Sequence, residues 1–412
     1  EEPLARIGGR TYRMDAARRL TLAALDQGQR PGVLSAILKY QLTEGNRQCI
    51  NDAMDIHGGK AIVIGPRNYL AHGYQALPIS ITVEGANILT RSLIIFGQGA
   101  IRAHPWLLKE MEAARDPRPA ARRAFDKALF AHLGYLISNV VRAWLLGLTG
   151  AVLTRAPVRG PTARYFRQIK RLCAAFCFTS DVVLLLLGGR FKFKEKLSGR
   201  LADALIHLYL SCAVLKRFED DGRPQADLPL LVWAMDDSLY AIQESLKGVL
   251  ANLPVPGIGR LARWLIFPTG LPYSPPSDST GREVARLLTT ENPSRDRLTA
   301  GVYVSDADDA SGRVHNAFHL ALMAARAEHA VRNALKEPVT FENYELLVQK
   351  AVESGVITEE QATTVRLAEE AARAVIEVDE FTRAEIEGFD EPAIRPAVRG
   401  DGEASDGGAP LR

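Results

Sequence analysis

A regular stripe of apolar residues in the middle of the chain does most to limit how it can fold. The stripe recurs at alternating intervals of four and three positions, at Leu201, Leu205, Leu208, Cys212 and Leu215. That spacing puts the five side chains on one face of an α-helix, whereas a half-buried strand would need an interval of two. The pattern therefore predicts a long helix whose apolar face packs on other helices.

Helical spacing also dominates the first hundred residues. Three helices are predicted there, at residues 1–27, 39–56 and 88–111. Gly28 closes the first and Gly58 the second, as expected for residues that favour the end of a helix. Three long helices of this kind make a bundle that is short of one member, so the truncated first helix should leave an apolar stripe exposed or bent onto later parts of the chain.

The remainder of the chain is also predicted to be helical. Thr280–Glu283 and Thr358–Gln361 have the capping-box pattern that begins a helix. Residues 254–276 contain several prolines and predict an irregular connection, and residues 389–412 predict a disordered tail. The whole chain is therefore predicted to be all-α.

Composition narrows the range of partners. The chain of 412 residues is 47% hydrophobic and 24% charged, so it can bury large cores. Its formal net charge of +3 is close to balance for this length, and we expect no nucleic acid partner. Its few, scattered cysteines favour a reducing compartment, and Cys173 and Cys177 are predicted to be buried and structural.

Residues 81–105 contain the strongest candidate for chemistry. Glu84 stands between an apolar, strand-like approach at residues 79–83 and an amphipathic helix. Gly85 allows another backbone or a ligand to come close, and Asn87 can cap the helix. A carboxylate here can act as a general base, because burial in an apolar pocket raises its pKa towards neutrality. The alternative is a structural carboxylate that caps or pairs at a helix start.

Two peptides carry a resemblance to a known family. DAMDIHGGKAI at residues 52–62 and VEGANILTRSLIIFGQGAIRAHPW at residues 83–106 resemble the C-terminal helical domain of the acyl-CoA dehydrogenases. Later segments resemble the extra C-terminal domain of the long bacterial β-oxidation branch, including LSGRLADALIHLYLSCAVLKRFEDDGR at residues 197–223. The resemblance implies a truncated C-terminal bundle at residues 1–115 and a second helical domain at residues 120–388.

The resemblance also implies roles for particular residues. Glu84 matches the base that removes a proton beside the thioester carbonyl, while FAD accepts the hydride. Gly58 and Gly59 match backbone that approaches the flavin across a subunit contact, and Gly85 and Asn87 match the turn beside the catalytic Glu. The implied reaction oxidises medium- to long-chain fatty acyl-CoA to trans-2-enoyl-CoA in fatty-acid β-oxidation. The implied partners are an electron-transfer acceptor and further copies of the parent enzyme.

Two observations limit the activity that the resemblance implies for this chain alone: departures from the family pattern and the lack of two of the family's domains. Asp55 and Lys60 flank the His-Gly-Gly turn where many relatives have other residues. The N-terminal helical and β-barrel domains of a complete member are lacking, and no glycine-rich phosphate loop replaces them. We therefore expect the C-terminal part of a longer polypeptide, inactive by itself.

Other features leave alternatives open. The apolar run at residues 182–187 is too short to cross a bilayer, so no membrane span is predicted. Basic clusters at residues 164–171 and 190–196 flank this run. Three interpretations stay open for them: solvated helix faces, contacts to the phosphates of coenzyme A, or contacts to an anionic membrane. The expected location is cytoplasmic, or peripheral at the inner membrane. The alternative function is a helical module that docks on a membrane or on partner β-oxidation enzymes.

No metal site is predicted from spacing. The histidines His57, His72, His104 and His132 have no metal-binding interval with one another or with a nearby carboxylate. His57 is instead predicted to be a turn residue.

Overall fold

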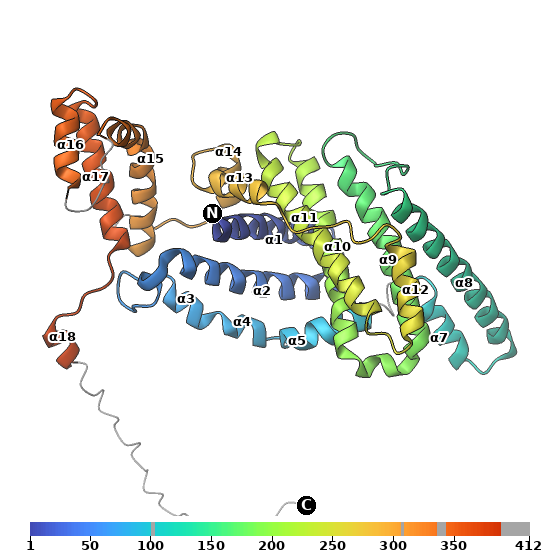
Figure 1. Ribbon diagram of the computed structural model, residues 1–412. Helices are drawn as coiled ribbons and strands as arrows, with labels where there is room; N and C mark the ends of the chain where they lie inside the picture. The colour runs from blue at the N-terminus through green and yellow to red at the C-terminus, as the bar shows by residue number, and fades with distance from the viewer. Residues whose placement is uncertain (100–103, 306–308, 336–342, 389–412) are drawn as a thin grey trace, which may run out of the picture.

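The computed structural model describes residues 1–99, 104–305, 309–335 and 343–388 (Figure 1). Within these ranges all regular structure is helical and no strand occurs, so the all-α prediction is confirmed. The predicted disordered tail at residues 389–412 lies outside the described residues. Several helices begin with proline in the first turn, where its missing N–H has no cost and its fixed φ suits a helix.

The N-terminal part is built on two long helices. They are α1 (Glu2–Asp26) and α2 (Gly32–His57), joined by a short turn at Gly28. A 3₁₀ turn, η1 (Gly58–Ala61), follows α2. The chain then returns along α2 through three short helices (Figure 1), which are α3 (Ala71–Ala76), α4 (Pro78–Thr82) and α5 (Asn87–Leu89).

Two predictions for this part are wrong. The strand-like approach to Glu84 is helical, since residues 78–82 form α4, with Pro78 in its first turn. The helix predicted over residues 88–111 is interrupted: a π-helix, η2 (Thr90–Gln98), follows α5, and a turn at residues 104–106 precedes α7 (Leu107–Arg115). Pro105 explains that turn, because proline disfavours helical backbone in the residue before it.

The middle of the chain forms the main helical body. Its long helices are α8 (Pro119–Leu148), α9 (Ala163–Leu187), α10 (Glu195–Asp220) and α11 (Leu228–Leu250). Shorter elements complete it: η3 (Gly188–Phe193), η4 (Gln225–Asp227), α12 (Pro256–Ile266), α13 (Asp278–Leu288) and α14 (Pro293–Thr299). The apolar stripe predicted on α10 is largely buried, although Cys212 is exposed.

Three local predictions in the second half can be compared with the structure. The segment expected to be irregular contains α12, so that expectation is wrong over residues 256–266. The capping box at Thr358 is confirmed, because its side chain and that of Gln361 bond each other's backbone N–H. The box expected at Thr280 is wrong: α13 begins earlier, and Ser277 accepts the bond from the Thr280 N–H.

A single apolar core joins the N-terminal helices to the main body. Its buried residues extend from Ala5 in α1 to Val284 in α13. Gly9 shows how closely α1 and α11 pack, because a Cβ atom there would lie 1.9 Å from the ring of Trp233. The first helix is thus packed onto later helices, which is one of the two predicted outcomes. The predicted division at residues 115–120 stays a prediction.

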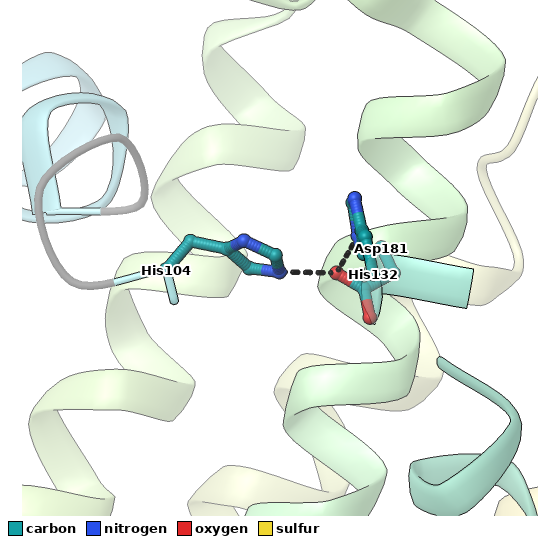
Figure 2. A group of neighbouring side chains, drawn as sticks. All are labelled: His104, His132 and Asp181. Atoms are coloured by element: carbon teal, nitrogen blue, oxygen red, sulfur yellow. Dashed lines mark hydrogen bonds and ion pairs between the residues drawn. The ribbon is translucent and has the colours of Figure 1, made fainter. Parts of the chain in front are cut away.

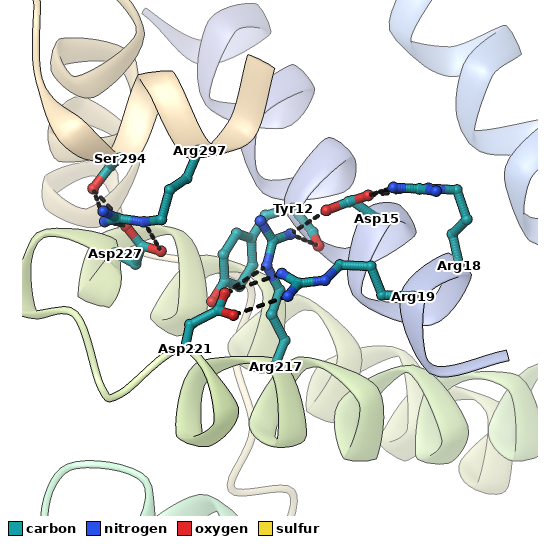
Figure 3. A network of polar contacts seen from close by, with 9 residues as sticks. All are labelled: Tyr12, Asp15, Arg18, Arg19, Arg217, Asp221, Asp227, Ser294 and Arg297. Carbon is teal, nitrogen blue, oxygen red and sulfur yellow. Dashed lines mark hydrogen bonds and ion pairs between the residues drawn. The ribbon is translucent and has the colours of Figure 1, made fainter. Parts of the chain in front are cut away.

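A polar network strengthens the same contact. The buried Arg217 of α10 donates to the carbonyl oxygen of Tyr12 at 3.1 Å and lies 4.2 Å from the centre of its ring. Arg217 also pairs with Asp15 at 3.0 Å, and Arg19 pairs with Asp221 at 2.9 Å. Figure 3 shows the network, which further includes Arg18, Asp227, Ser294 and Arg297.

A second, smaller core lies near the C-terminus. It is formed by α15 (Ala310–Leu335), α16 (Tyr344–Glu353) and α17 (Glu359–Ile376), which lie at the opposite end of the molecule from α8 (Figure 1). A short helix, α18 (Arg383–Gly388), ends the described chain. Most of the fully buried positions in this core are alanine or valine, so the three helices approach each other closely.

Two helical stretches are long and apolar enough to cross a membrane, by length and composition alone. They are Pro119–Leu148 and Ala163–Phe193, and the bent pair formed by residues 71–82 and 87–97 is long and apolar enough when the two are taken together. The prediction that no such stretch is visible is wrong, because it considered only the uninterrupted run at residues 182–187. Small and weakly polar residues extend the apolar part of α9 well beyond that run.

Candidate functional site

Glu84 lies in a tight turn between α4 and α5. Its φ angle is +55° and that of Gly85 is +102°, so two consecutive residues adopt the left-handed region that favours glycine. A glutamate held in this region is uncommon and costs backbone strain, which surrounding contacts must offset. Glu84 is exposed, and no ion pair or hydrogen bond of its carboxylate is found within the described part of the chain. The buried apolar pocket expected around Glu84 is therefore not formed by these residues.

The turn is held in place by α2. Lys39 donates from Nζ to the carbonyl oxygen of Gly85 at 2.9 Å and to Oδ1 of Asn87. The amide nitrogen of Asn87 donates to Thr43 Oγ1 and to Glu44 Oε1, both at 2.9 Å. Asn87 was expected to cap the following helix, and this is wrong: it is the first residue of α5 and is buried against α2 instead.

Exposed apolar residues flank Glu84 along the chain. Ile79, Val83, Ile88 and Leu89 expose between 44% and 75% of their area. Exposed aliphatic side chains gathered in one segment are typical of surfaces that bind another molecule or domain. A cover over this turn would remove water from the Glu84 carboxylate as well.

The glycine turn after α2 has a different character. Gly58 has a φ of +58°, and both Gly58 and Gly59 are exposed, with no neighbouring atom within 4 Å of an added Cβ. His57 fixes the turn, because its ring nitrogens contact the carbonyl oxygen of Ala53 at 2.7 Å and the hydroxyl of Tyr69. Its predicted role as a turn residue agrees with these contacts. The backbone at Gly58 and Gly59 is thus accessible to another molecule.

The two turns do not form one site within a single chain. Asn87 contacts α2 at Thr43 and Glu44, whereas Gly58 follows the end of α2. The separation of 13 positions from Glu44 to His57 corresponds to roughly 20 Å of helix. Gly58 and Gly59 therefore lie at one end of α2, and Glu84, Gly85 and Asn87 lie nearer its middle.

The loop after the glycine turn is covered by a segment from far along the chain. Lys60 donates from Nζ to the carbonyl oxygen of Glu377 at 2.7 Å, and burial lowers the pKa of this lysine. Asp379 accepts hydrogen bonds from the backbone N–H of Arg67. The unusual lysine after the His-Gly-Gly turn thus has a structural partner, whereas nothing in the structure explains Asp55.

The residues that position the candidate base could not be found by spacing. Lys39, Thr43 and Glu44 lie more than forty positions from Asn87 in the sequence. Lys39 and Thr43 lie one turn apart on the same helix face, but that face also carries Ser35 and Arg47, so residue type alone does not single them out. The partner segment at residues 377–379 gives no local signal.

Two family models match the chain. The model described as acyl-CoA dehydrogenase, C-terminal domain, matches residues 2–96. The model described as acyl-CoA dehydrogenase, C-terminal, bacterial type, matches residues 101–381, which is more than half of the chain.

A solved structure has a similar fold. It is described as the crystal structure of an acyl-CoA dehydrogenase complexed with FAD from Bacillus anthracis, and the similarity has a TM-score of 0.51 at 14% sequence identity. The match covers 70% of this chain and 48% of that one. The chain thus spans about half the length of the solved relative, and at this identity the likeness concerns the fold alone.

Proposed function

Because the chain belongs to the acyl-CoA dehydrogenase family, with the bacterial-type C-terminal region, we propose that it is the C-terminal part of an FAD-dependent enzyme. That enzyme would oxidise medium- to long-chain fatty acyl-CoA to trans-2-enoyl-CoA in fatty-acid β-oxidation. The observation that carries the proposal is the Glu84 turn. Its carboxylate has no partner among the residues that the structure describes, and it belongs to a strained turn flanked by exposed aliphatic residues, in the family's matching region.

The residues present fit the flavin that the family implies. Gly58 and Gly59 offer exposed backbone with open space beside it, and Gly85 has a positive φ with no side chain to obstruct an approach. These residues would hold FAD at subunit contacts of the parent enzyme. When bound, FAD supplies the acceptance of a hydride.

Glu84 would take the proton from the carbon next to the thioester carbonyl. A solvated carboxylate is a weak base at neutral pH, and covering the neighbouring aliphatic side chains would remove water from it and make it a stronger base. Lys39 keeps the turn in position through Gly85 and Asn87 without contacting the carboxylate. The turn would therefore work only after the rest of the enzyme covers it.

The test uses the chain together with the residues that precede it in the parent polypeptide. The absorption bands of bound flavin should bleach when a long-chain acyl-CoA is added. Glu84→Gln should retain flavin and lose both the bleaching and turnover, by at least about a thousandfold, whereas the exposed control Glu195→Gln should retain both. Turnover in Glu84→Gln close to that of the parent would contradict the role of Glu84.

A second candidate function rests on the outer face of α8. Phe130, Leu133, Ile137, Val141 and Leu145 recur at intervals of three and four, and each exposes between 47% and 72% of its area. Only 11% of the most apolar 18-residue stretch of this helix is buried. Arg122, Arg123 and Lys127 lie near its N-terminal end. An apolar stripe next to basic residues suits the surface of an anionic membrane.

The basic clusters named from the sequence contribute unequally to this candidate. Arg171 is buried and lies 5.6 Å from the centre of the Tyr273 ring, so it is neither a solvated nor a membrane-facing residue. Lys192 and Lys194 are exposed next to Phe193, which exposes 74% of its area. Binding to phosphatidylglycerol vesicles should weaken in Ile137→Gln and in Lys192→Glu with Lys194→Glu. Unchanged vesicle binding in these variants would exclude this surface.

A further inference from the structure

Two histidines and an aspartate that are distant in the sequence meet at the junction of α7, α8 and α9. His104 belongs to the turn before α7, His132 to α8 and Asp181 to α9. His104 Nε2 lies 3.0 Å from Asp181 Oδ1, and His132 Nε2 lies 3.5 Å from the same oxygen (Figure 2). One ligand atom from each residue lies within 4.8 Å of the others. No metal site was predicted from the sequence intervals of these histidines, and the fold nevertheless brings two of them to one carboxylate.

The chemistry of the group suits a divalent transition metal. Zinc is held by histidine nitrogens and carboxylate oxygens at about 2.0–2.2 Å, which places tetrahedral ligand atoms about 3.4 Å apart. The two separations from Asp181 Oδ1 are close to that value. Two histidines and one carboxylate would leave a position for water or for a further ligand.

Asp181 has unused bonding capacity at this point. Its side chain is 3% exposed, and its second oxygen, Oδ2, is buried without a hydrogen-bond partner in the described part of the chain. A buried carboxylate oxygen without a partner carries a desolvation cost that a bound cation removes. The cluster is thus incomplete in a way that a cation would complete.

The contacts of His132 also favour a bound cation. Its Nδ1 lies 2.8 Å from Glu110 Oε1, so the N–H at Nδ1 donates to that carboxylate. In the neutral ring, Nε2 then carries a lone pair that faces the carboxylate of Asp181. Two acceptors that face each other need a cation or a proton between them. A carboxylate on the far nitrogen of a histidine is also the usual second partner of a metal ligand.

His104 is the ligand that has to move. Its Nδ1 accepts from the backbone N–H groups of Trp106 at 3.2 Å and Leu107 at 3.0 Å, so its own proton lies on Nε2 and is donated to Asp181. A neutral imidazole that binds metal through Nε2 must carry its proton on Nδ1. Metal binding therefore requires this ring to turn away from the two backbone N–H groups at the start of α7.

We propose that His104, His132 and Asp181 form a binding site for a divalent transition metal, with zinc as the best fit, and that the metal fastens α7 and α8 to α9. Glu110 orients His132 from behind. The site is independent of the Glu84 turn, and it lies where the match to the bacterial-type C-terminal model begins. Its occupation would fix the start of that region onto the main helical body.

The test is Zn²⁺ binding to the full chain by calorimetry, with Co²⁺ absorption as a second probe. An exposed pair, His315 and His319, has Nε2 atoms 3.1 Å apart and could chelate metal on the surface. All measurements are therefore made in a His315→Gln, His319→Gln background. About one equivalent of Zn²⁺ should bind to this background protein, and Co²⁺ should give the visible absorption bands of a tetrahedral site. Hydrogen exchange of the backbone amides of Trp106 and Leu107 should become faster when the metal binds.

Three variants in that background decide the proposal. Asp181→Asn and His132→Gln should each weaken Zn²⁺ binding at least about 100-fold, and Glu110→Gln about 10- to 100-fold. His132 is partly exposed, so this variant serves if Asp181→Asn does not fold. Binding that is absent from the background protein, or unchanged in His132→Gln, would overturn the proposal.

Discussion

Asp379 accepts a hydrogen bond of 3.0 Å from the backbone N–H of Arg67, 312 positions earlier in the chain. The Arg67 side chain pairs with Glu377 at 3.0 Å, and the carbonyl oxygen of Glu377 accepts from Lys60. The segment that follows α17 thus lies on the loop that follows Gly58 and Gly59. The end of the bacterial-type region thereby supports a turn that belongs to the other family match.

Removing the Asp379 carboxylate should loosen that loop. Asp379→Ala leaves the Arg67 N–H without its acceptor, at a cost of about 1 kcal/mol. Hydrogen exchange of the Arg67 amide should then be roughly fivefold faster. The exposed neighbour Glu380→Ala is the control, and equal exchange in the two variants would mean that the contact does not hold the loop.

Lys39 should determine the order of the Glu84 turn. Lys39→Met keeps the length of the side chain and removes the donor to Gly85 and Asn87, at a cost of about 1–3 kcal/mol. Exchange of the backbone amides at residues 84–90 should increase, while α1 stays protected. Gln48→Met, at an exposed position further along the same helix, should leave these amides unchanged. If both variants behave alike, the turn is held by other contacts.

Two glycine-to-alanine changes within helices should have opposite effects on stability. Gly9→Ala puts a methyl group against the Trp233 ring, and the overpacking should lower the free energy of unfolding by about 1–3 kcal/mol. Gly134 lies in the exposed part of α8 with open space beside it, so Gly134→Ala should raise the free energy of unfolding by up to about 1 kcal/mol. Denaturant titrations measure both, and a neutral Gly9→Ala would mean that α1 and α11 can move apart.

His207 should make the protein sensitive to acid. Burial lowers the pKa of His207 to about 3, the positive charge of Arg13 acts in the same direction, and Asp237 opposes them. Below about pH 6.5 the unfolded chain binds a proton here that the folded chain does not bind, so stability is lost as the pH falls. The loss should approach 1.4 kcal/mol per pH unit from this residue, down to its folded pKa.

His207→Gln tests this assignment. The variant removes the titrating group and should flatten the dependence of the free energy of unfolding on pH between about 4 and 6. His72→Gln, at an exposed position, should leave the dependence as it is. A profile for His207→Gln that matches the parent would show that other groups cause the loss.

Local sequence patterns predicted most of the helices but few of the contacts. The spans of α1 and most of α2 followed from apolar spacing, because burial on one face repeats with the helical period. The strand-like prediction for residues 79–83 was wrong. Ile79, Ile81 and Val83 alternate as in a strand, but Pro78 and the packing on α2 favour a helix. Pro105 is a local signal for the helix break, but the apolar spacing continues past it and led to the prediction of one unbroken helix.

The sites depend on contacts between distant residues, which spacing does not reveal. Glu84 was found through a motif, whereas its anchor Lys39 required the packing of α5 on α2. His104 and Asp181 are 77 positions apart, and only the junction of three elements brings them together. Charge and residue type suggest candidates for such pairs, but the three-dimensional structure is needed to decide which of them are in contact.

The two separate apolar cores have a consequence for how the molecule comes apart. The large core includes side chains from both family matches, so neither match can be removed without exposing buried residues of the other. The alanine-rich core of α15–α17 shares none of its buried residues with the large one. Loss of structure should therefore proceed in two steps, one for each core, with the contacts of Glu377 and Asp379 to Lys60 and Arg67 as a link between the two units.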